Sequence, residues 1–353
     1  MKEQKTILQT FDYELFLGRK SGSVDKCLIE PTNLLLNLFK KHKFTGAIFF
    51  VDTTYLFKLK QRSEQACIDD FKSISEQLIA IISRGHYVYP HIHPHWLDAI
   101  YLKEINQWDL SNYSKYRFNL ISEEEKNIVF DESIQVLKSI ISQKFPDYKI
   151  DGYRAGGWCI QPFSEFKPFF EKYQIKFEFS VLTGHSNFTK AHYFDFTSAP
   201  KKEIYRFSND ICLEDESGVF KQFTISSVQL NKIATTKEKI YLKFLRYKGD
   251  KSFGDGIGLV LKSNEEKIKP TNKNESTSKS INERVSIELL NASKLLLYKK
   301  FLSENNYMHF ISHPKMLSVH NLKAIDKFLY FASANYNLNT DFKKLNDNHY
   351  KLK

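Results

Sequence analysis

Strand-length apolar runs alternate with helical periodicity along the N-terminal part of this chain. Residues 44–51 form a nearly unbroken apolar run, as expected for a strand buried on both faces. Between residues 63 and 83 the apolar side chains recur at helical spacing, and Gly85 follows as a stop signal. A rhythm of strand, helix and strand is typical of parallel βαβ units. We therefore predict an α/β fold built on a mainly parallel sheet.

The length and composition are those of a globular protein. The chain has 353 residues, 42% hydrophobic and 26% charged, which suits one large α/β barrel or two ordinary domains. No apolar run approaches the roughly 18 residues of a membrane helix, and the N-terminus lacks the apolar region and cleavage site of a secretory signal. The four cysteines are far apart and form no Cys-x-x-Cys pair, which fits a reducing compartment. We predict a cytoplasmic protein.

The net charge of +11 at pH 7 bears on partners. Such a balance favours an anionic partner such as a phosphate, a nucleotide or an acidic lipid surface, and a lysine-rich composition produces it equally well with no partner. The lysines are spread along the chain, and neither paired zinc ligands nor a basic heptad region occurs. We predict no nucleic-acid partner and no transmembrane segment, and peripheral contact with a membrane stays open.

Residues 85–96 contain four of the eleven histidines. The run before them has the pattern of a buried strand, which Pro90 is expected to end. His91 and His95 stand four apart, and this spacing brings two imidazoles to one side of a helical turn. Because neutral imidazole is the commonest metal ligand among side chains, we predict a metal site that uses both.

The other two histidines of this stretch, His86 and His93, fall outside the paired spacing. We expect them to be structural or exposed. The alternative for the stretch as a whole is a surface loop that happens to be rich in histidine and proline.

Polar side chains directly follow four predicted strands. Asp12, Arg154 and His313 each come just after a strand-like run, and so does the pair His91 and His95. In a parallel α/β barrel or open sheet, that end of the strands carries the chemistry. A carboxylate, imidazoles and a guanidinium at one edge of a sheet are hard to explain by packing alone, so we predict a catalytic site there.

Four short motifs in this order resemble the NodB-type polysaccharide deacetylases, and most closely their WalW-type branch among polysaccharide-biosynthesis proteins. The resemblance spans residues 6 to about 331, and residues 208–280 match it poorly. It implies a distorted (β/α) barrel and a divalent metal, usually zinc, in an enzyme that hydrolyses an N-acetyl or O-acetyl group on a sugar. The motifs are T-F-D at residues 10–12, G-H-x-x-x-x-H-x-x-x-H at 85–95, R-A-G-G-W at 154–158 and S-H-P at 312–314.

The resemblance also implies a role for each matched residue. Asp12 corresponds to the general base, and Arg154 to the residue that pairs with that base. His91 and His95 correspond to metal ligands, and His313 to the general acid. These residue types suit amide hydrolysis, which needs a polarised carbonyl, an activated water and a proton for the departing amine.

One position departs from the family pattern. The family has a second, metal-binding aspartate next to the first, and here Tyr13 occupies that position. A phenol is a poor ligand at neutral pH. Residues two apart in an extended segment project to the same side, so Glu14 can replace the missing ligand beside Asp12 while Tyr13 turns away. The alternative is that Asp12 itself binds the metal, which leaves the base unassigned.

On this basis we predict one deacetylase-like barrel domain over residues 1–335, followed by a tail at 336–353. Insertions are expected at about 97–121, as a loop over the site, and at 208–284, including a flexible polar stretch at 262–280. The predicted substrate is an acetylated carbohydrate, free or linked to a lipid or nucleotide, and the bond cleaved is an amide or an ester. The alternative is a barrel that has lost efficient hydrolysis and binds carbohydrate or supports assembly.

Overall fold

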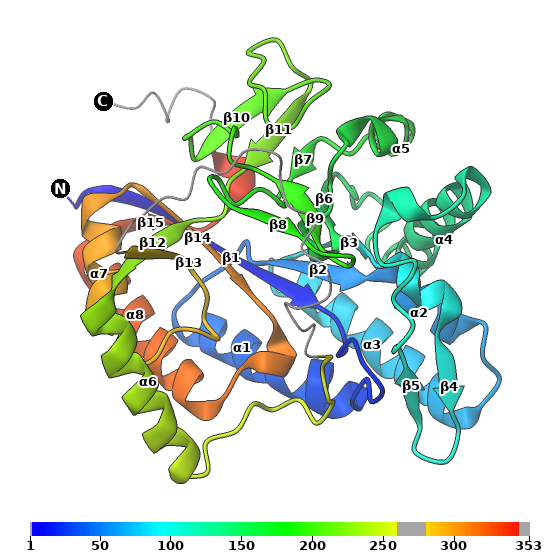
Figure 1. Cartoon of the computed structure of the whole chain (residues 1–353), viewed down its shortest axis with the longest axis horizontal. Coiled ribbons are helices and arrows are strands. Elements are labelled where there is room, and N and C mark those ends of the chain that lie inside the picture. The colour runs from blue at the N-terminus through cyan, green and yellow to red at the C-terminus, as the bar shows by residue number, and fades with distance from the viewer. Residues whose placement is uncertain (1, 260–279, 346–353) are drawn as a thin grey trace.

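A nine-stranded sheet lies at the centre of the molecule. The computed structural model describes residues 2–259 and 280–345, arranged as Figure 1 shows. The strand order is β10-β11-β7-β6-β3-β2-β1-β14, with β15 also paired to β1, and neighbours run parallel except for β10 and β11. This confirms a mixed α/β fold with a mainly parallel sheet. The strands are β1 (Gln4–Tyr13), β2 (Ile48–Asp52), β3 (Tyr87–Ile92), β6 (Gly152–Ala155), β7 (Phe177–Glu178), β10 (Ile204–Phe207), β11 (Phe220–Phe223), β14 (Tyr307–Ser312) and β15 (Asn337–Asn339).

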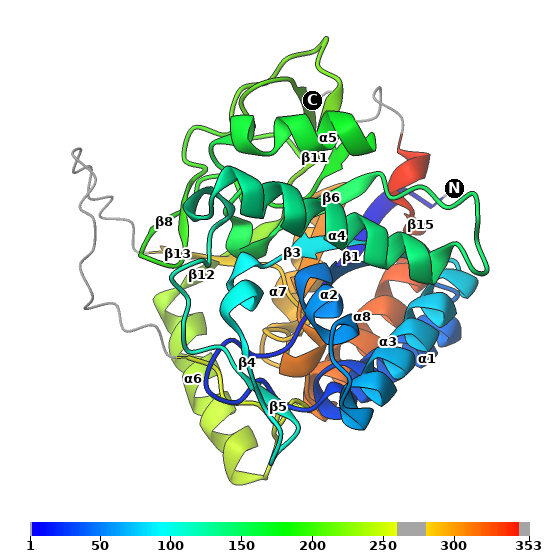
Figure 2. The same cartoon turned by 90° about the vertical axis from the view of Figure 1, so that its right-hand side faces the viewer.

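Eight α-helices are found in the described residues, and none of them is long and apolar enough to cross a membrane. Three of these helices pack together: α3 contacts α1 through a hydrogen bond from Gln77 to Asn33, and Lys41 of α1 pairs with Asp326 of α8. Figure 2 shows these three side by side. The helices are α1 (Glu30–Lys41), α2 (Thr53–Lys60), α3 (Gln65–Ser83), α4 (Glu123–Ile141), α5 (Lys167–Tyr173), α6 (Lys232–Tyr247), α7 (Leu295–Glu304) and α8 (Val319–Asn335).

The sheet curls, and within the described residues strand pairing does not close it into a barrel. Residues outside the strands, rather than a further strand, form hydrogen bonds with the outer edge of β14. Ser226 N donates to His309 O at 3.2 Å, and Ile311 N donates to Val285 O at 3.0 Å. These bonds satisfy backbone groups of β14 that an open edge would leave without partners. The distorted barrel implied by the resemblance is therefore present here as a curled, open sheet.

The two expected insertions contain regular structure. Within 97–121, β4 (Ile100–Leu102) and β5 (Gln107–Asp109) form an antiparallel pair, and Trp108 is buried against Trp96. Within 208–284, β11 belongs to the central sheet, and α6 is flanked by β12 (Ser227–Asn231) and β13 (Ser280–Arg284), which pair with each other. The expected flexible stretch 262–280 lies outside the described residues except for its last position, Ser280, which starts β13. A further pair, β8 (Ser186–Phe188) and β9 (Tyr193–Asp195), forms a short ribbon.

Residues 336–345, expected as the start of a tail, are part of the folded unit. Asn337–Asn339 form β15 and pair with the first residues of β1, from Gln4 to Thr6. Phe342 is buried and contacts the rings of Phe177 and Phe179. The residues there show no strong periodicity, because a three-residue strand is too short to produce one.

The end of β1 alternates as an extended segment should. Tyr13 is buried in the core, and its hydroxyl donates to Gln77 Oε1 at 2.8 Å. Asp12 and Glu14 project to the opposite side, where both line one pocket. The expectation that the phenol faces away from the two carboxylates is therefore confirmed by the geometry.

Replacing Tyr13 by Phe should lower the free energy of unfolding by about 1–3 kcal/mol, because Gln77 Oε1 loses its buried donor. The amount of metal that the protein binds should not change. Urea denaturation and metal analysis of the purified variant measure both quantities. Tyr330→Phe is the control, since that side chain is 71% exposed. A Tyr13→Phe protein of unchanged stability that had lost metal would place the phenol in the pocket instead.

Candidate metal centre and active site

The polar residues at the strand ends meet around one pocket of about 280 Å³. Asp12 and Glu14 come from the end of β1, and His91 comes from β3. His313 enters from the residue after β14. The pocket is lined by Asp12, Glu14, His91, His93, Tyr116, Gly157, Trp158, Asn187, His192, Phe194, Arg284 and His313. Of the residues predicted at the strand ends, Asp12, His91 and His313 line this pocket, and Arg154 of β6 contacts Asp12 without lining it.

Glu14, His91 and His93 form a group that can hold a metal ion. Their ligand atoms all lie within 4.8 Å of one another. Glu14 Oε2 is 2.7 Å from His93 Nε2 and 3.4 Å from His91 Nε2, and the two Nε2 atoms are 3.1 Å apart. One carboxylate and two imidazoles that leave further positions open are the donor set of many catalytic zinc sites. The residues present therefore fit a divalent metal.

The orientation of His91 supports this assignment. Its Nδ1 lies 2.9 Å from the carbonyl oxygen of Arg154, which only accepts, so the neutral ring carries its N–H at Nδ1 and donates that hydrogen bond. The lone pair is then on Nε2, which faces Glu14 and His93, as expected of a metal-ligating histidine whose other nitrogen is held by a backbone carbonyl. Burial opposes a positive charge on this ring, but Asp12 and Glu14 raise the pKa of His91. The same negative field favours a bound cation.

His95 is not part of this group, contrary to the predicted pairing of His91 with His95. It lies in the single turn Pro94–Asp98, is buried, and its ring stacks on Tyr116 at a centroid distance of 5.4 Å. Burial lowers the pKa of His95 well below the usual range, so the ring is neutral. The spacing argument assumed a helical turn between the two histidines, whereas the chain there stays extended.

The extended path explains why His93 takes that place. Pro90 does not end β3, which continues to Ile92: β2 pairs with it through Pro90 and His91, and β6 pairs with it from His91 onwards. His93 is itself extended, with φ −118° and ψ 93°, so it projects to the same side as His91. The expectation that His93 is structural or exposed does not match its place in the pocket. His86 is structural: it is buried and its Nδ1 accepts from Ala47 N.

Arg154 fixes Asp12. The guanidinium is fully buried, and its Nη1 donates to Asp12 Oδ1 at 2.6 Å. Nη2 donates to Thr10 Oγ1 and Nε donates to Phe179 O, so that every nitrogen of the fork has a partner. Burial alone would raise the pKa of Asp12, but Arg154 and the neighbouring histidines hold it below its usual range. Asp12 is therefore ionised, with Oδ2 left for the pocket.

His313 reaches the pocket with a carboxylate behind it. Its Nε2 is 3.6 Å from Asp12 Oδ2 and 3.7 Å from Glu14 Oε1. On the other side, Glu288 accepts from His313 N at 2.8 Å and lies 3.1 Å from Nδ1. Burial opposes the charged ring, but Glu288 raises the pKa of His313, so it keeps its proton more readily than a free histidine. A protonated imidazole at this position is a suitable general acid.

Lys315 contacts the other oxygen of Glu14. It is almost fully buried, and its Nζ lies 3.0 Å from Glu14 Oε1. Burial would raise the pKa of Glu14, but Lys315 and His93 hold it well below the usual range. The ammonium leaves Oε2 facing the two imidazoles. Glu14 therefore directs one oxygen atom, Oε2, towards His91 and His93.

One wall of the pocket is formed by Tyr116 and His192, with Trp158 nearby. The Tyr116 hydroxyl is 3.1 Å from His192 Nε2. Burial lowers the pKa of His192 to about 4, so this ring is neutral and can exchange hydrogen bonds with the phenol. Trp158 is half-buried and its ring packs edge-on against Phe194. Aromatic faces that line a polar pocket suit the apolar face of a sugar ring.

The two glycines of the R-A-G-G-W motif make room for this arrangement. A Cβ on Gly156 would lie 2.7 Å from His93 Nδ1 and 2.5 Å from Ile92 O. Gly157 has φ +58°, and a Cβ there would lie 2.7 Å from the ring of Tyr116. Both positions therefore need glycine, because His93 packs closely against Gly156 and Tyr116 against Gly157.

Sequence reasoning missed His93, Lys315 and Glu288. A signal for His93 was available, because the alternation argument applied to Asp12 and Glu14 holds equally for His91 and His93. Lys315 follows the S-H-P motif by one residue, but a lysine in that position carries no signal of burial. Glu288 lies between β13 and α7 and reaches His313 only through the tertiary fold.

Comparison with known proteins finds likeness among solved structures. No protein-family model matches the sequence, and no curated protein is similar to it. Among solved structures, a 4-alpha-glucanotransferase from Thermococcus litoralis matches with a TM-score of 0.50 and 12% identity, over 99% of this chain and 41% of that one. A protein from Mycobacterium smegmatis assigned as a polysaccharide deacetylase gives 0.47, with 10% identity over 96% of this chain and 87% of that one.

A third structure is the catalytic domain of a peptidoglycan N-acetylglucosamine deacetylase from Eubacterium rectale. It gives a TM-score of 0.36 and 12% identity, over 96% of this chain and 88% of that one. At such identities a likeness concerns the fold alone, and of these three structures the glucanotransferase alone reaches 0.50. The chain spans less than half the length of that enzyme.

Because His93 belongs to the Glu14–His91–His93 group and His95 does not, replacing each by alanine should change Zn²⁺ affinity by different amounts. His93→Ala should reduce the affinity for Zn²⁺ by more than the roughly tenfold to hundredfold effect of losing an outer-sphere partner. His95→Ala should have a smaller effect, because its ring stacks on Tyr116 outside the group. Calorimetric titration of the metal-free proteins with Zn²⁺ measures both, and circular dichroism checks the fold. The reverse order of effects would restore His95 as the ligand.

Gly156→Ala should also weaken Zn²⁺ binding, because the added methyl group would clash with the carbonyl oxygen of Ile92 and with the ring of His93 and so displace His93. Gly258→Ala is a matched control, since a Cβ there meets its nearest neighbour at an ordinary 3.5 Å. The titration is the same as for the histidine variants. Equal Zn²⁺ affinity in both glycine variants would mean that the position of His93 does not matter to the metal.

Proposed function

We propose that the chain is a metal-dependent hydrolase that removes an acetyl group from an N- or O-acetylated sugar. The observation that carries the proposal is the Glu14–His91–His93 group beside Asp12. His313, directly after the neighbouring strand β14, faces the carboxylates of Asp12 and Glu14. A ligand group, an ionised carboxylate and a protonated imidazole around one small pocket form the set that acetyl hydrolysis needs. The resemblance of the four motifs to NodB-type deacetylases of the WalW branch supports the same function.

In this proposal each residue has a defined task. Glu14, His91 and His93 would hold the metal, which we take to be zinc and which supplies polarisation of the acetyl carbonyl and a water of lowered pKa. Asp12, held by Arg154, accepts the proton of the attacking water through Oδ2. His313, oriented by Glu288, donates a proton to the departing nitrogen or oxygen of the sugar.

The geometry favours Glu14 over Asp12 as the ligand. Asp12 Oδ1 is committed to Arg154, and its Oδ2 is 3.9 Å from His91 Nε2. Glu14 Oε2 is closer to both imidazoles. The alternative of a barrel that only binds carbohydrate depended on a tyrosine at a ligand position. Tyr13 points into the core, and Glu14 occupies the ligand position. The tyrosine therefore gives no reason to prefer a protein that only binds carbohydrate.

The wider setting of the reaction is also proposed. The four cysteines are all buried and unpaired, which suits a reducing cytoplasm. We propose a single deacetylase-type domain related to a distorted barrel, acting on a carbohydrate that is free or linked to a lipid or nucleotide. A pocket of about 280 Å³ accommodates one acetylated sugar unit more readily than a longer segment.

Two variants should separate metal binding from catalysis. Asp12→Asn and His313→Ala should each lower turnover by about two to four powers of ten, as expected for loss of a general base or acid. Both should still bind Zn²⁺. Acetate release from a panel of N- and O-acetylated sugars, including nucleotide-linked and lipid-linked forms, measures turnover.

His42→Ala is the control for this experiment, because His42 also pairs with a carboxylate, Asp326, but lies away from the pocket. The control should hydrolyse as the parent does. Zn²⁺-loaded parent protein that released no acetate from any of these sugars would contradict the proposal. Undiminished turnover in both site variants would remove Asp12 and His313 from the mechanism.

A further inference from the structure

α6 exposes a stripe of large apolar side chains to solvent. Ile240, Phe244 and Tyr247 are 65%, 51% and 87% exposed. They are four and three residues apart, so they lie along one face of the helix. In both views of the molecule α6 lies at the periphery (Figures 1 and 2). Scattered apolar residues on a surface are ordinary, whereas a continuous row on one helix indicates that something covers it.

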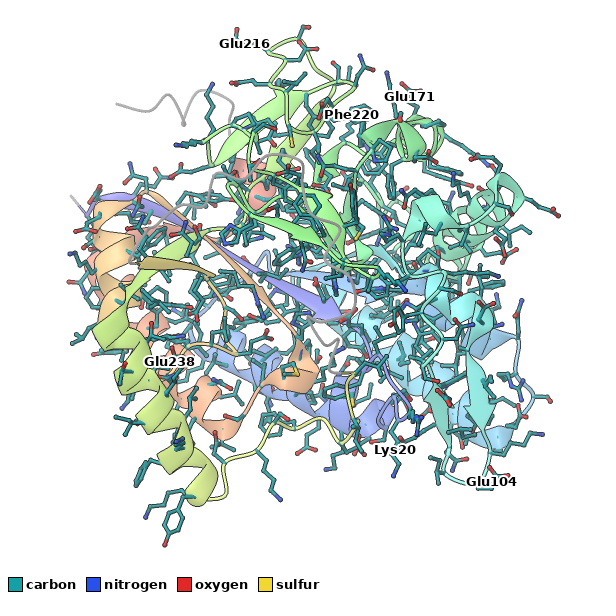
Figure 3. The ribbon with its side chains drawn as sticks, viewed as in Figure 1. Lys20, Glu104, Glu171, Glu216, Phe220 and Glu238 are labelled. Atoms are coloured by element: carbon teal, nitrogen blue, oxygen red, sulfur yellow. The ribbon has the colours of Figure 1, made fainter. Side chains whose placement is uncertain are left out.

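A buried ion pair fixes which face of α6 points outward. Glu238, labelled on α6 in Figure 3, pairs with Lys294 at 2.5 Å. The same ammonium pairs with Glu283 of β13 at 2.6 Å, and it is only 3% exposed. Leu245, two turns further along this face, is 4% exposed. Because Glu238 and Leu245 turn inward, the apolar stripe cannot rotate into the protein.

Basic side chains flank the stripe. Lys239 and Lys243 are exposed on α6, and Lys251 is exposed beyond its end. The ammonium of Lys248 lies 5.6 Å from the centre of the Phe244 ring. Glu238 is the single acidic residue in the sequence of α6, and it is the one that turns inward. The outward face therefore combines apolar and positive groups.

We propose that α6 docks on the surface of an anionic lipid bilayer. Ile240, Phe244 and Tyr247 would enter the boundary between head groups and acyl chains, and the lysines would contact lipid phosphates. A helix with an apolar stripe and a basic flank is the arrangement that such a surface binds. The proposal does not depend on the reaction at the pocket.

Charge complementarity favours lipid over the other occupants. A second copy of this chain docked face to face would bring two rows of lysines together, which costs free energy. A nucleic-acid duplex would attract the lysines, but its outer surface of phosphates and sugars would not bury Ile240 and Phe244. An anionic bilayer satisfies both parts of the face at once.

Vesicle binding by the full chain tests the proposal. Sedimentation with vesicles of phosphatidylcholine, alone or with about one third phosphatidylglycerol, should show binding that is stronger to the anionic vesicles and weakened by salt. The double variant Ile240→Ser, Phe244→Ser should lower the partition coefficient at least about tenfold. Lys239→Gln and Lys243→Gln should each lower binding to anionic vesicles by about fivefold and leave binding to neutral vesicles nearly unchanged.

Matched controls come from α4, away from α6 in Figure 1. Ile128 is 44% exposed there and Lys138 is exposed, so Ile128→Ser and Lys138→Gln should bind vesicles as the parent does. Circular dichroism confirms that every variant is folded. The proposal is overturned if the parent ignores anionic vesicles, or if the α4 variants lose as much binding as the α6 variants. It is also overturned if the parent self-associates in sedimentation velocity and the α6 variants abolish that association instead.

Discussion

The buried ion pair between Arg154 and Asp12 connects most of the sheet to the site. Arg154 on β6 reaches across to β1, where it binds both Asp12 and Thr10, and it also bonds the backbone at Phe179, just after β7. Its guanidinium lies over the ring of Phe50 on β2, at 4.3 Å from the ring centre. A buried guanidinium without partners would be strongly destabilising. Its hydrogen bonds therefore require the strand ends to meet in one arrangement, and the pocket is built on that arrangement.

The carboxylates of Asp12 and Glu14, at the end of β1, have the same pattern of contacts. Each has one oxygen held by a cation and one oxygen left for the pocket: Arg154 holds Asp12 Oδ1, and Lys315 holds Glu14 Oε1. Two carboxylates so close together would repel each other and one would take up a proton if they were unpaired. With a separate cation for each, both stay ionised in a buried place. One can then serve as a ligand while the other accepts a proton.

The sequence was sufficient to predict those features of the fold and site that depend only on neighbouring residues. The parallel α/β pattern and the alternation of Asp12, Tyr13 and Glu14 follow from periodicities that a single strand imposes. The pairing of His91 with His95 failed because a helical period was applied to a segment that stays extended through His93. The contact between Glu288 and His313 joins residues whose neighbourhood depends on the whole fold, so no spacing in the sequence could reveal it.

The position of β15 has a consequence for how the protein is made. β1 pairs with β14 and β15, two strands that lie about 300 residues further along the sequence: Gln4 pairs with Asn337 and Thr6 with Tyr307. During synthesis β1 emerges before β14 and β15, so it cannot be enclosed on both sides until the chain up to Asn339 has left the ribosome. An apolar strand with open edges is prone to pair with other chains in the meantime. A truncated or stalled chain would therefore expose the very strand that carries Asp12 and Glu14, and it would be a natural client of chaperones.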